Sequence, residues 1–404
     1  MIDLQERLAE LESSGLRRRL RVIDGPQGPQ VLLDGRPVLL LCSNNYLGLA
    51  DHPRLRRAAA DAALSLGTSA GASRLISGTM SIHAELESRL ADFKGTEAAL
   101  LFGSGYLANT GTIAALARRD EVVFSDELNH ASIIDGCRLA GAETFVYRHA
   151  DTEHLAWGLR RAGGRAALVV TDGVFSMDGD VAPLAELAEL SVRHGCRLLV
   201  DEAHATGCIG PGGRGSVAAA GVTDEVDVIV GTLGKALGGY GAYVCGSAEL
   251  VDYLVNSARP FIFSTAPPPP SVAAAGAALD LISEHSGLVQ RLGENAAALR
   301  DGLRAEGLEP IGSETQIVPL VIGEADDTMA LCERLLDEGV FAQAIRPPTV
   351  PPGTCRLRLT TMATHRTADL RHAAKLIGAA ARDLGLGTRA ECSRPDVSTL
   401  RKAA

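Results

Sequence analysis

Apolar runs of strand length alternate with longer segments of mixed polarity over the first two thirds of the chain. The runs are rich in branched or aromatic residues and are bounded by glycine or polar turns; they are 98–102, 121–124, 143–147, 166–171, 198–200 and 226–230. The segments between them have helical length, among them 108–117, 153–161 and 184–193. Strands that alternate with helices predict a mostly parallel sheet covered by helices on both faces.

The two ends of the chain show different patterns. Residues 3–22 predict an amphipathic helix, and 30–41 predict a hairpin that turns at Asp34-Gly35. A proline run at 267–270 and an alanine-rich helix at 271–284 lead into a segment that predicts a smaller α+β domain. We therefore expect four parts, which are an N-terminal helix and hairpin at 1–50, a large domain at 51–284, a small domain at 285–387 and a flexible tail at 388–404.

Composition and charge narrow the class of protein. With 404 residues, of which 46% are hydrophobic, the chain can bury a large core, and we expect it to form more than one domain. A net charge of −10 argues against nucleic acid as a partner, because phosphate binding needs a basic surface. Aromatic residues make up only 4%, so base-stacking platforms are not expected either.

The eight cysteines are scattered and include no C-x-x-C pair. This is neither a zinc spacing nor a disulfide framework, so we expect reduced thiols and no metal site. No apolar stretch reaches the length of a membrane span, and the first residues are charged where a signal peptide is apolar. The sequence therefore predicts a cytoplasmic protein with no membrane partner.

The stretch 198–241 carries the strongest chemical signal. One strand ends on Asp201, with His204 three residues later, and the next ends on a glycine-rich turn that contains Lys235. Ligands of open α/β sheets bind at the carboxyl ends of the strands, where these groups would lie. Pyridoxal phosphate (PLP) needs a lysine for its Schiff base and an acid facing its ring nitrogen. The pattern therefore predicts a PLP site.

Two other readings of this stretch are weaker. Residues 201–204 also spell a helicase box, but a phosphate loop of the form G-x-x-x-x-G-K-[ST] should precede that box. Here Gly234-Lys235 follows it, and Ala236 stands in place of the hydroxyl residue. Asp201 could instead cap a helix while Lys235 is a solvated charge, but their joint position at two strand ends argues against this.

A second site element follows the strand at 98–102. Ser104, Gly105 and Tyr106 connect it to a helix, and backbone N–H groups at a helix start can bind a phosphate. The same residues match G-x-G-x-x-A, so a dinucleotide-binding dehydrogenase is the main alternative from local evidence. A dehydrogenase explains neither Lys235 nor His130, a histidine just beyond another strand whose flat ring could cover a cofactor.

From about residue 15 to residue 386, the chain resembles the α-oxoamine synthases, which are PLP enzymes of fold type I. The matching stretches occur in order along the chain and are SNNYLGLADHP (43–53), GASRLISGT (71–79), FGSGYLANTG (102–111), SDELNHASIIDG (125–136), TDGVFSMDGD (171–180), VDEAHATGCIGPGGRG (200–215), GTLGKALGGYG (231–241) and FIFSTAPPP (261–269). Relatives usually carry Glu where this chain has Asp172. The resemblance implies a transferase whose homodimer shares its active sites.

The resemblance also implies site residues. The catalytic set would be Lys235 as Schiff-base lysine and proton carrier, Asp201 on the ring nitrogen, His204 on the ring oxygen and His130 stacked on the ring. Further cofactor contacts would be Ser176 on the ring oxygen, Ser104, Gly105, Tyr106 and Thr232 around the phosphate, and Ser264 and Thr265 from the partner subunit. The substrate contacts would be Asn44 and Arg358 on the amino acid carboxylate, with Arg346 and Arg21 near the acyl group.

Within the family, the double-proline phrase in 344–360 resembles the members of biotin biosynthesis that use L-alanine. Their reaction is a decarboxylative condensation of L-alanine with pimeloyl-CoA or pimeloyl-ACP, which yields 8-amino-7-oxononanoate, CO2 and free thiol. The glycine-using relatives, 2-amino-3-ketobutyrate CoA ligase and 5-aminolevulinate synthase, usually lack this phrase. A glycine-using member, a dehydrogenase and a non-catalytic protein of the same fold remain alternatives.

Overall fold

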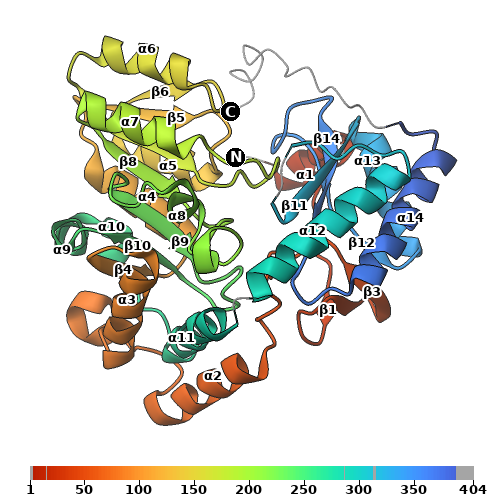
Figure 1. Cartoon of the computed structure of the whole chain (residues 1–404), viewed down its shortest axis with the longest axis horizontal. Helices are drawn as coiled ribbons and strands as arrows, with labels where there is room; N and C mark the ends of the chain where they lie inside the picture. Colours follow the sequence, from red (N-terminus) through yellow and green to blue (C-terminus); the bar gives the residue numbers. More distant parts are fainter. Residues whose placement is uncertain (1–2, 15, 286, 313–314, 388–404) are drawn as a thin grey trace. The chain divides into compact units, whose positions relative to one another are not determined.

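The computed structural model describes residues 3–14, 16–285, 287–312 and 315–387, which form two compact units (Figure 1). The large unit comprises Asn45–Ser176 and Asp180–Gln290. The small unit comprises the described residues within Met1–Asn44, Met177–Gly179 and Arg291–Ala404. The expected tail at 388–404 lies outside the described residues.

A seven-stranded sheet forms the centre of the large unit, with the order β4-β10-β9-β8-β7-β5-β6. Its strands are β4 (Ala98–Phe102), β5 (Val122–Asp126), β6 (Glu143–Tyr147), β7 (Ala166–Asp172), β8 (Arg197–Asp201), β9 (Val228–Thr232) and β10 (Ala242–Gly246). The neighbours from β6 to β9 are parallel, whereas β10 is antiparallel to both β9 and β4. The expectation of a mostly parallel sheet is confirmed.

Helices enclose this sheet, because every residue of central strands such as β5 and β10 is buried and needs apolar cover on both faces. The helices are α2 (Pro53–Leu66), α3 (Ser81–Lys94), α4 (Gly105–Leu116), α5 (Ala131–Ala140), α6 (Thr152–Ala162), α7 (Leu184–His194), α8 (Ser216–Ala220), α9 (Ala248–Ser257), α10 (Arg259–Ile262) and α11 (Pro269–Glu284), with a π-helical turn η1 (Arg74–Gly78) and a 3₁₀ turn η2 (Pro211–Gly213). Helices α4, α5, α9 and α10 share one apolar core with the strands.

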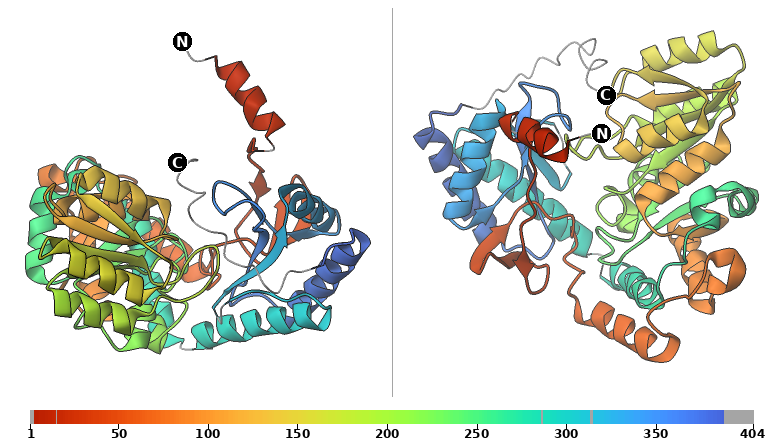
Figure 2. Two further views of the ribbon diagram at one scale, coloured as in Figure 1. Left: turned by 90° about the horizontal axis from the view of Figure 1, so that it is seen from above. Right: turned by 180° about the vertical axis from the view of Figure 1, so that it is seen from behind.

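The small unit contains two sheets and a helical layer (Figure 2). One sheet has the order β1-β2-β3-β12 and the other β11-β14-β13. The strands are β1 (Ile23–Asp24), β2 (Gln30–Leu33), β3 (Arg36–Leu40), β11 (Ile317–Gly323), β12 (Val340–Phe341), β13 (Ala344–Ile345) and β14 (Cys355–Thr360). The helices are α1 (Leu4–Ser13), α12 (Gly287–Ala305), α13 (Ala325–Asp337) and α14 (Thr367–Asp383), of which the last three pack on β11 and β14.

The boundaries of the two units differ from the four expected parts. We expected residues 1–50 to form a separate segment, but those up to Asn44 belong to the small unit. The physical reason is a parallel pairing of β3 with β12, in which Leu39 lies opposite Val340. The large unit begins at Asn45 and ends at Gln290, a few residues beyond each end of the expected 51–284, and Met177–Gly179 within that range belong to the small unit.

The N-terminal segment contains one correct and one incorrect prediction. The hairpin is confirmed, because Leu33 lies opposite Arg36 and leaves a two-residue turn with positive φ at Asp34. The helix expected over 3–22 ends instead at Ser13. Ser13 and Ser14 both donate side-chain hydrogen bonds to the carbonyl of Glu10, which compete with continuation of the helix.

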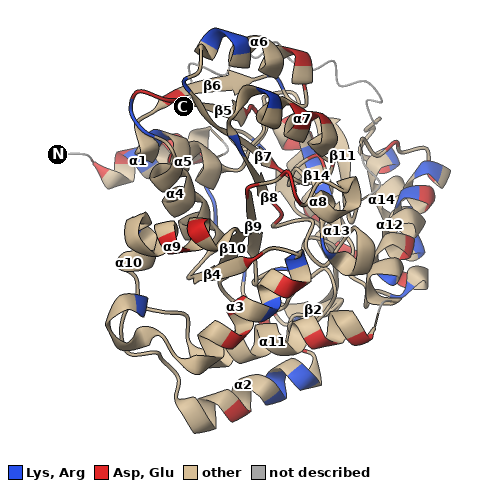
Figure 3. Ribbon diagram, turned by 60° about the vertical axis from the view of Figure 1, so that its left-hand side comes forward, with Lys and Arg blue, Asp and Glu red and all other residues tan. Residues whose placement is uncertain are grey.

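The charges of the described helices are mixed in sign. Helices α2, α6 and α14 each carry both acidic and basic residues (Figure 3). Some of these residues form ion pairs one helical turn apart, such as Arg57 with Asp61. Within the described ranges, no helix is both long enough and apolar enough to cross a membrane.

Candidate active site

The carboxyl ends of four strands meet at one edge of the large sheet. Phe102 at the end of β4 and Thr232 at the end of β9 both lie opposite Ala242, where the antiparallel strand β10 begins. On the other side of β9, Asp201 ends β8 and lies opposite Asp172 at the end of β7. The register therefore brings the turns after β4, β7, β8 and β9 to the same edge.

Lys235 and His204 are in direct contact at this edge. The Nζ atom of Lys235 lies 2.8 Å from Nε2 of His204. The other ring nitrogen, Nδ1, lies 2.6 Å from the hydroxyl of Tyr46, whose side chain is fully buried. A phenol, an imidazole and an amine are thus linked by two hydrogen bonds, and the sequence did not single out Tyr46.

The carboxylate of Asp201 is held by donors on both sides. Its Oδ1 accepts the N–H of Ala203 at 2.8 Å, and its Oδ2 accepts Nδ2 of Asn109 at 2.6 Å. Asp201 is only 5% exposed, so these bonds replace water around a buried charge. Asn109 comes from α4, and it was also not singled out by sequence.

His130 follows β5 and caps α5. Its Nδ1 lies 2.7 Å from the hydroxyl of Ser132, and its backbone N–H donates to Asp172. Desolvation lowers the pKa of His130, and the charge of Lys235 lowers it further against the opposing effect of Asp201. Burial, with repulsion from Asp201, raises the pKa of Asp172 well above its ordinary value.

A buried ion pair shapes the loop that carries His204. Glu202 is fully buried and accepts Nζ of Lys94, the hydroxyl of Ser216 and the N–H of Val217. Gly215 has φ +108 and packs so closely on Glu202 that a Cβ atom there would lie 1.7 Å from the carboxylate. This pair fixes the loop from 202 to 217 and with it the position of the imidazole.

The turn after β4 has the features of an anion site. Helix α4 begins at Gly105, earlier than the expected start at 108, and the hydroxyl of Ser104 accepts the N–H of Leu107. The first N–H groups of a helix have no partner within it, and a Cβ at Gly105 would meet no atom within 4 Å. Tyr106 is exposed, and its hydroxyl donates to Asp135.

The remaining cofactor candidates of the large unit occupy turns. The hydroxyl of Thr232 accepts the N–H of Gly234 and thereby shapes the turn that carries Lys235. Ser176 is half-buried in the turn after β7. Ser264 and Thr265 follow α10, and Thr265 forms a β-bridge with Ser73.

The four substrate candidates belong to the small unit. Arg358 on β14 is 6% exposed, and its Nη1 donates to Oδ1 of Asn44 at 3.3 Å. Burial raises the pKa of Cys42 to about 12, although both Arg358 and Arg21 lower it by their charge. Burial likewise raises the pKa of Cys332, while Arg21 and Arg346 lower it. Each of the three arginine candidates therefore lowers the pKa of at least one of these two thiols by its charge.

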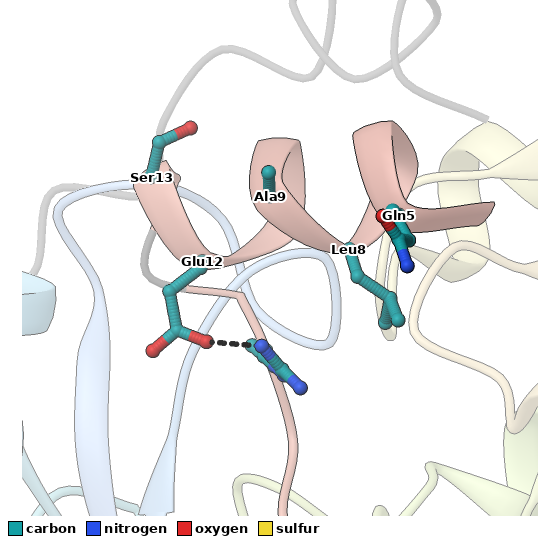
Figure 4. Close-up of a pocket in the computed structure, with 6 residues that line it drawn as sticks. Gln5, Leu8, Ala9, Glu12 and Ser13 are labelled. Carbon is teal, nitrogen blue, oxygen red and sulfur yellow. Dashed lines mark hydrogen bonds and ion pairs between the residues drawn. The ribbon is translucent and has the colours of Figure 1, made fainter. Parts of the chain in front are cut away.

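A surface hollow of about 650 Å³ lies along α1 (Figure 4). Its walls include Leu8 and Ala9, and an ion pair between Glu12 and Arg17 at 3.0 Å crosses one side. None of the candidate site residues lines it. This hollow therefore contributes nothing to the chemistry at the sheet edge.

The residues at the sheet edge fit PLP. An amine is available at Lys235, and the carboxylate of Asp201 is buried and aimed by two donors. The open start of α4 at Gly105 suits a phosphate, while His130 offers an imidazole ring whose pKa is lowered by desolvation. Each group suits a different part of the cofactor. Lys235 suits the aldehyde, Asp201 the ring nitrogen, the start of α4 at Gly105 the phosphate, and His130 the ring face.

The comparisons with known proteins decide the family. The family model described as aminotransferase class I and II matches residues 36–377. The chain belongs to this family. A relative named 8-amino-7-oxononanoate synthase, from Geobacter metallireducens, is 56% identical over 94% of this chain and 98% of its own length. The chain is therefore a PLP-dependent enzyme, and the resemblance to the α-oxoamine synthases is confirmed.

Two solved structures have the same fold. A serine palmitoyltransferase from S. paucimobilis, with a bound PLP–myriocin adduct, has a TM-score of 0.90 and 34% identity over 95% of this chain and 97% of its own. An 8-amino-7-oxononanoate synthase from Francisella tularensis has a TM-score of 0.74 and 26% identity over 86% and 98%. These neighbours confirm the fold class predicted from sequence.

The dinucleotide alternative is wrong. Its fingerprint requires a strand that continues through a helix into an adjacent parallel strand. Here β4 is an edge strand, antiparallel to β10, and four strands separate it from β5. The match at 103–108 instead marks the turn that opens α4.

Proposed function

We propose that this enzyme condenses L-alanine with a pimeloyl thioester, releasing CO2 and free thiol and giving 8-amino-7-oxononanoate in biotin biosynthesis. The structural observation that carries the proposal is the contact of Lys235 with His204 at the same sheet edge as the anchored carboxylate of Asp201. The acyl and amino substrates are inferred from the relatives' names, the first of which is 56% identical to this chain.

PLP, when bound, withdraws electrons from the amino acid's Cα, which makes the Cα proton acidic and favours loss of a carboxylate. The protein has to hold the ring, orient the Cα–H bond and move the proton. We assign the proton transfer to Lys235, because it is the amine at the sheet edge. His204, 2.8 Å away, can accept or return a proton at Nε2.

The other groups of the large unit hold the cofactor in this proposal. Asp201 would keep the ring nitrogen protonated by charge pairing, and His130 would cover the ring face. His204 and Ser176 would bind the ring oxygen. The phosphate would be held by Ser104, Gly105, Tyr106 and Thr232.

We assign the substrate carboxylates to arginines of the small unit. A buried guanidinium suits a planar carboxylate because it can bind both oxygens, and Arg358 beside Asn44 is such a group. Arg21 and Arg346, which lie around Cys332, are assigned to the acyl substrate.

We further propose a homodimer in which Ser264 and Thr265 complete the partner's phosphate site. The supporting observation is an exposed apolar surface beside them. Ile76 is 81% exposed and Phe263 is 70% exposed, on two segments joined by the bridge between Ser73 and Thr265. We also propose a cytoplasmic location, on the basis of eight scattered cysteines that have no disulfide-framework spacing.

The test is a product assay with the purified chain and added PLP. L-alanine is supplied with pimeloyl-CoA in one reaction and with pimeloyl-ACP in another, and glycine with acetyl-CoA is run in parallel. We expect 8-amino-7-oxononanoate by mass spectrometry with at least one pimeloyl donor. Turnover of glycine with acetyl-CoA alone would replace the proposal with a glycine-using member of the family.

A further inference from the structure

A continuous chain of hydrogen bonds links Asp201 to His130 across the cofactor edge. Asn109 on α4 has its Nδ2 2.6 Å from Oδ2 of Asp201 and 2.9 Å from Oγ of Ser132. The hydroxyl of Ser132 in turn lies 2.7 Å from Nδ1 of His130. Both linking side chains are buried, at 1% and 0% exposure, so water does not compete for these bonds.

The direction of each bond follows from the chemistry of the groups. A carboxylate only accepts, so the amide group of Asn109 that touches Asp201 must be its NH2. The second proton of that NH2 is donated to Ser132, which is then free to donate its own hydroxyl proton to His130. The backbone N–H of Ser132 also points to Nδ1 of His130, at 3.2 Å.

Two donors therefore meet at Nδ1 of His130, which must be an acceptor. An imidazolium carries a proton on both nitrogens and would face these donors with a third. The arrangement selects the neutral ring with its proton on Nε2. Other titratable groups near the ring are Asp201, Lys235 and Asp172, and the carboxyl of Asp172 accepts the backbone N–H of His130. Desolvation and Lys235 lower the pKa of the ring and so act in the same direction.

We propose that Asn109 and Ser132 are positioning residues that hold Asp201 as an oriented anion and His130 as a neutral, Nε2-protonated ring. The inference rests on the proposed function, because it gives these two groups their roles toward PLP. A neutral ring can lie against the cofactor without placing a second positive charge beside its protonated nitrogen. Asp201 would then be the only charged group that this chain of hydrogen bonds directs at the ring nitrogen of PLP.

The test is histidine NMR on the full chain, labelled with ¹³C and ¹⁵N in its histidines. The signal of His130 is assigned by its loss in His130→Gln. In the wild-type chain we expect the ¹⁵N shifts of the Nε2–H form and a titration midpoint below the ordinary histidine value. In Ser132→Ala we expect the midpoint to rise toward that value, and in Ser132→Thr, which restores a hydroxyl, we expect it to return.

Binding of PLP to the apoprotein supplies a second readout for Asn109→Ala. Loss of a hydrogen bond to the buried carboxylate should weaken the binding by about tenfold. Ser191→Ala is the matched control, because Ser191 is a buried serine on α7 that bonds the carbonyl of Leu187. It should leave both the His130 titration and PLP binding unchanged.

The inference is overturned if wild-type His130 carries its proton on Nδ1, or if Ser132→Ala leaves its titration unchanged. Wild-type PLP affinity in Asn109→Ala would overturn the role given to Asn109. Neither readout depends on which amino acid or thioester is used. Failure of the product assay with normal NMR and PLP results would therefore remove the proposed reaction and leave this inference in place.

Discussion

The Nε2 atom of His204 lies 2.8 Å from Nζ of Lys235, and its Nδ1 lies 2.6 Å from the hydroxyl of Tyr46. A phenol hydroxyl can donate or accept, so the imidazole can carry its proton on either nitrogen. With the proton on Nδ1 it accepts from a charged lysine, and with the proton on Nε2 it donates to a neutral one. The pair can therefore accommodate both protonation states of the amine.

Tyr46→Phe tests this relationship. The variant removes only the hydroxyl, so Nδ1 of His204 loses its hydrogen bond to Tyr46. The two tautomers of the imidazole, with the proton on Nδ1 or on Nε2, then no longer have the same partners. We expect kcat to fall by about tenfold and its pH profile to shift, with a loss of about 1 kcal/mol in the free energy of unfolding. The measurements are kcat against pH and urea unfolding.

Tyr243→Phe is the matched control for this variant. Tyr243 is another fully buried tyrosine, and its hydroxyl bonds Thr206 at 2.9 Å rather than His204. It should lose a similar stability with an unchanged pH profile. If both variants behave alike in the kinetic assay, Tyr46 has no specific effect on His204.

Lys235→Ala should retain PLP but lose turnover, with kcat lower by about 10³-fold, because the amine that moves the proton is absent. PLP retention is measured after gel filtration, and product formation is measured by mass spectrometry. Lys375→Ala, at an exposed position on α14, serves as control and should match the wild type. A Lys235→Ala enzyme with wild-type turnover would disprove the assignment.

Asp172→Asn and Asp201→Asn should behave differently although the two residues lie side by side. The pKa of Asp172 is raised by burial and by Asp201, so its folded form holds a proton that the unfolded form loses above about pH 4. Stability contributed by this group therefore falls as pH rises, and asparagine should keep or increase the melting temperature at pH 7. Asp201→Asn should instead weaken PLP binding by at least about tenfold.

His149 predicts a loss of stability at alkaline pH. Burial lowers its pKa, but hydrogen bonds to Asp126 at 3.0 Å and Asp180 at 2.6 Å outweigh this and raise it from 6.5 to about 10. Because the folded pKa is raised, the stabilisation is complete below pH 6.5 and disappears as pH approaches 10.

We expect His149→Gln to cost about 3 kcal/mol in urea unfolding at pH 6.5, since it leaves the buried carboxylate of Asp126 and the half-buried carboxylate of Asp180 without their cation. The same variant should differ little from wild type near pH 10. His372→Gln, at an exposed position on α14, is the control. An equal loss at both pH values would show that His149 acts by packing alone.

Local pattern predicted most of the large unit, because each strand and its terminal turn are encoded within a few residues. The alternation of apolar runs was enough to place Asp201 and Lys235 at strand ends. It was not enough for the helix expected over 3–22, where serine hydroxyls end α1 at Ser13. Nor could it predict that β3 pairs with β12, since these strands are about 300 residues apart in sequence.

The sequence alone determined the chemistry at the sheet edge, because motif residues such as Lys235 and His130 occupy fixed positions after their strands. Only the tertiary structure decided which partners those groups have. Tyr46 reaches His204 from a loop 158 residues away, and Asn109 reaches Asp201 from a helix 92 residues away. Such contacts depend on how strands and helices pack, and the spacing of residues within one short segment does not predict that packing. The partners that orient the site therefore became visible only in the folded chain.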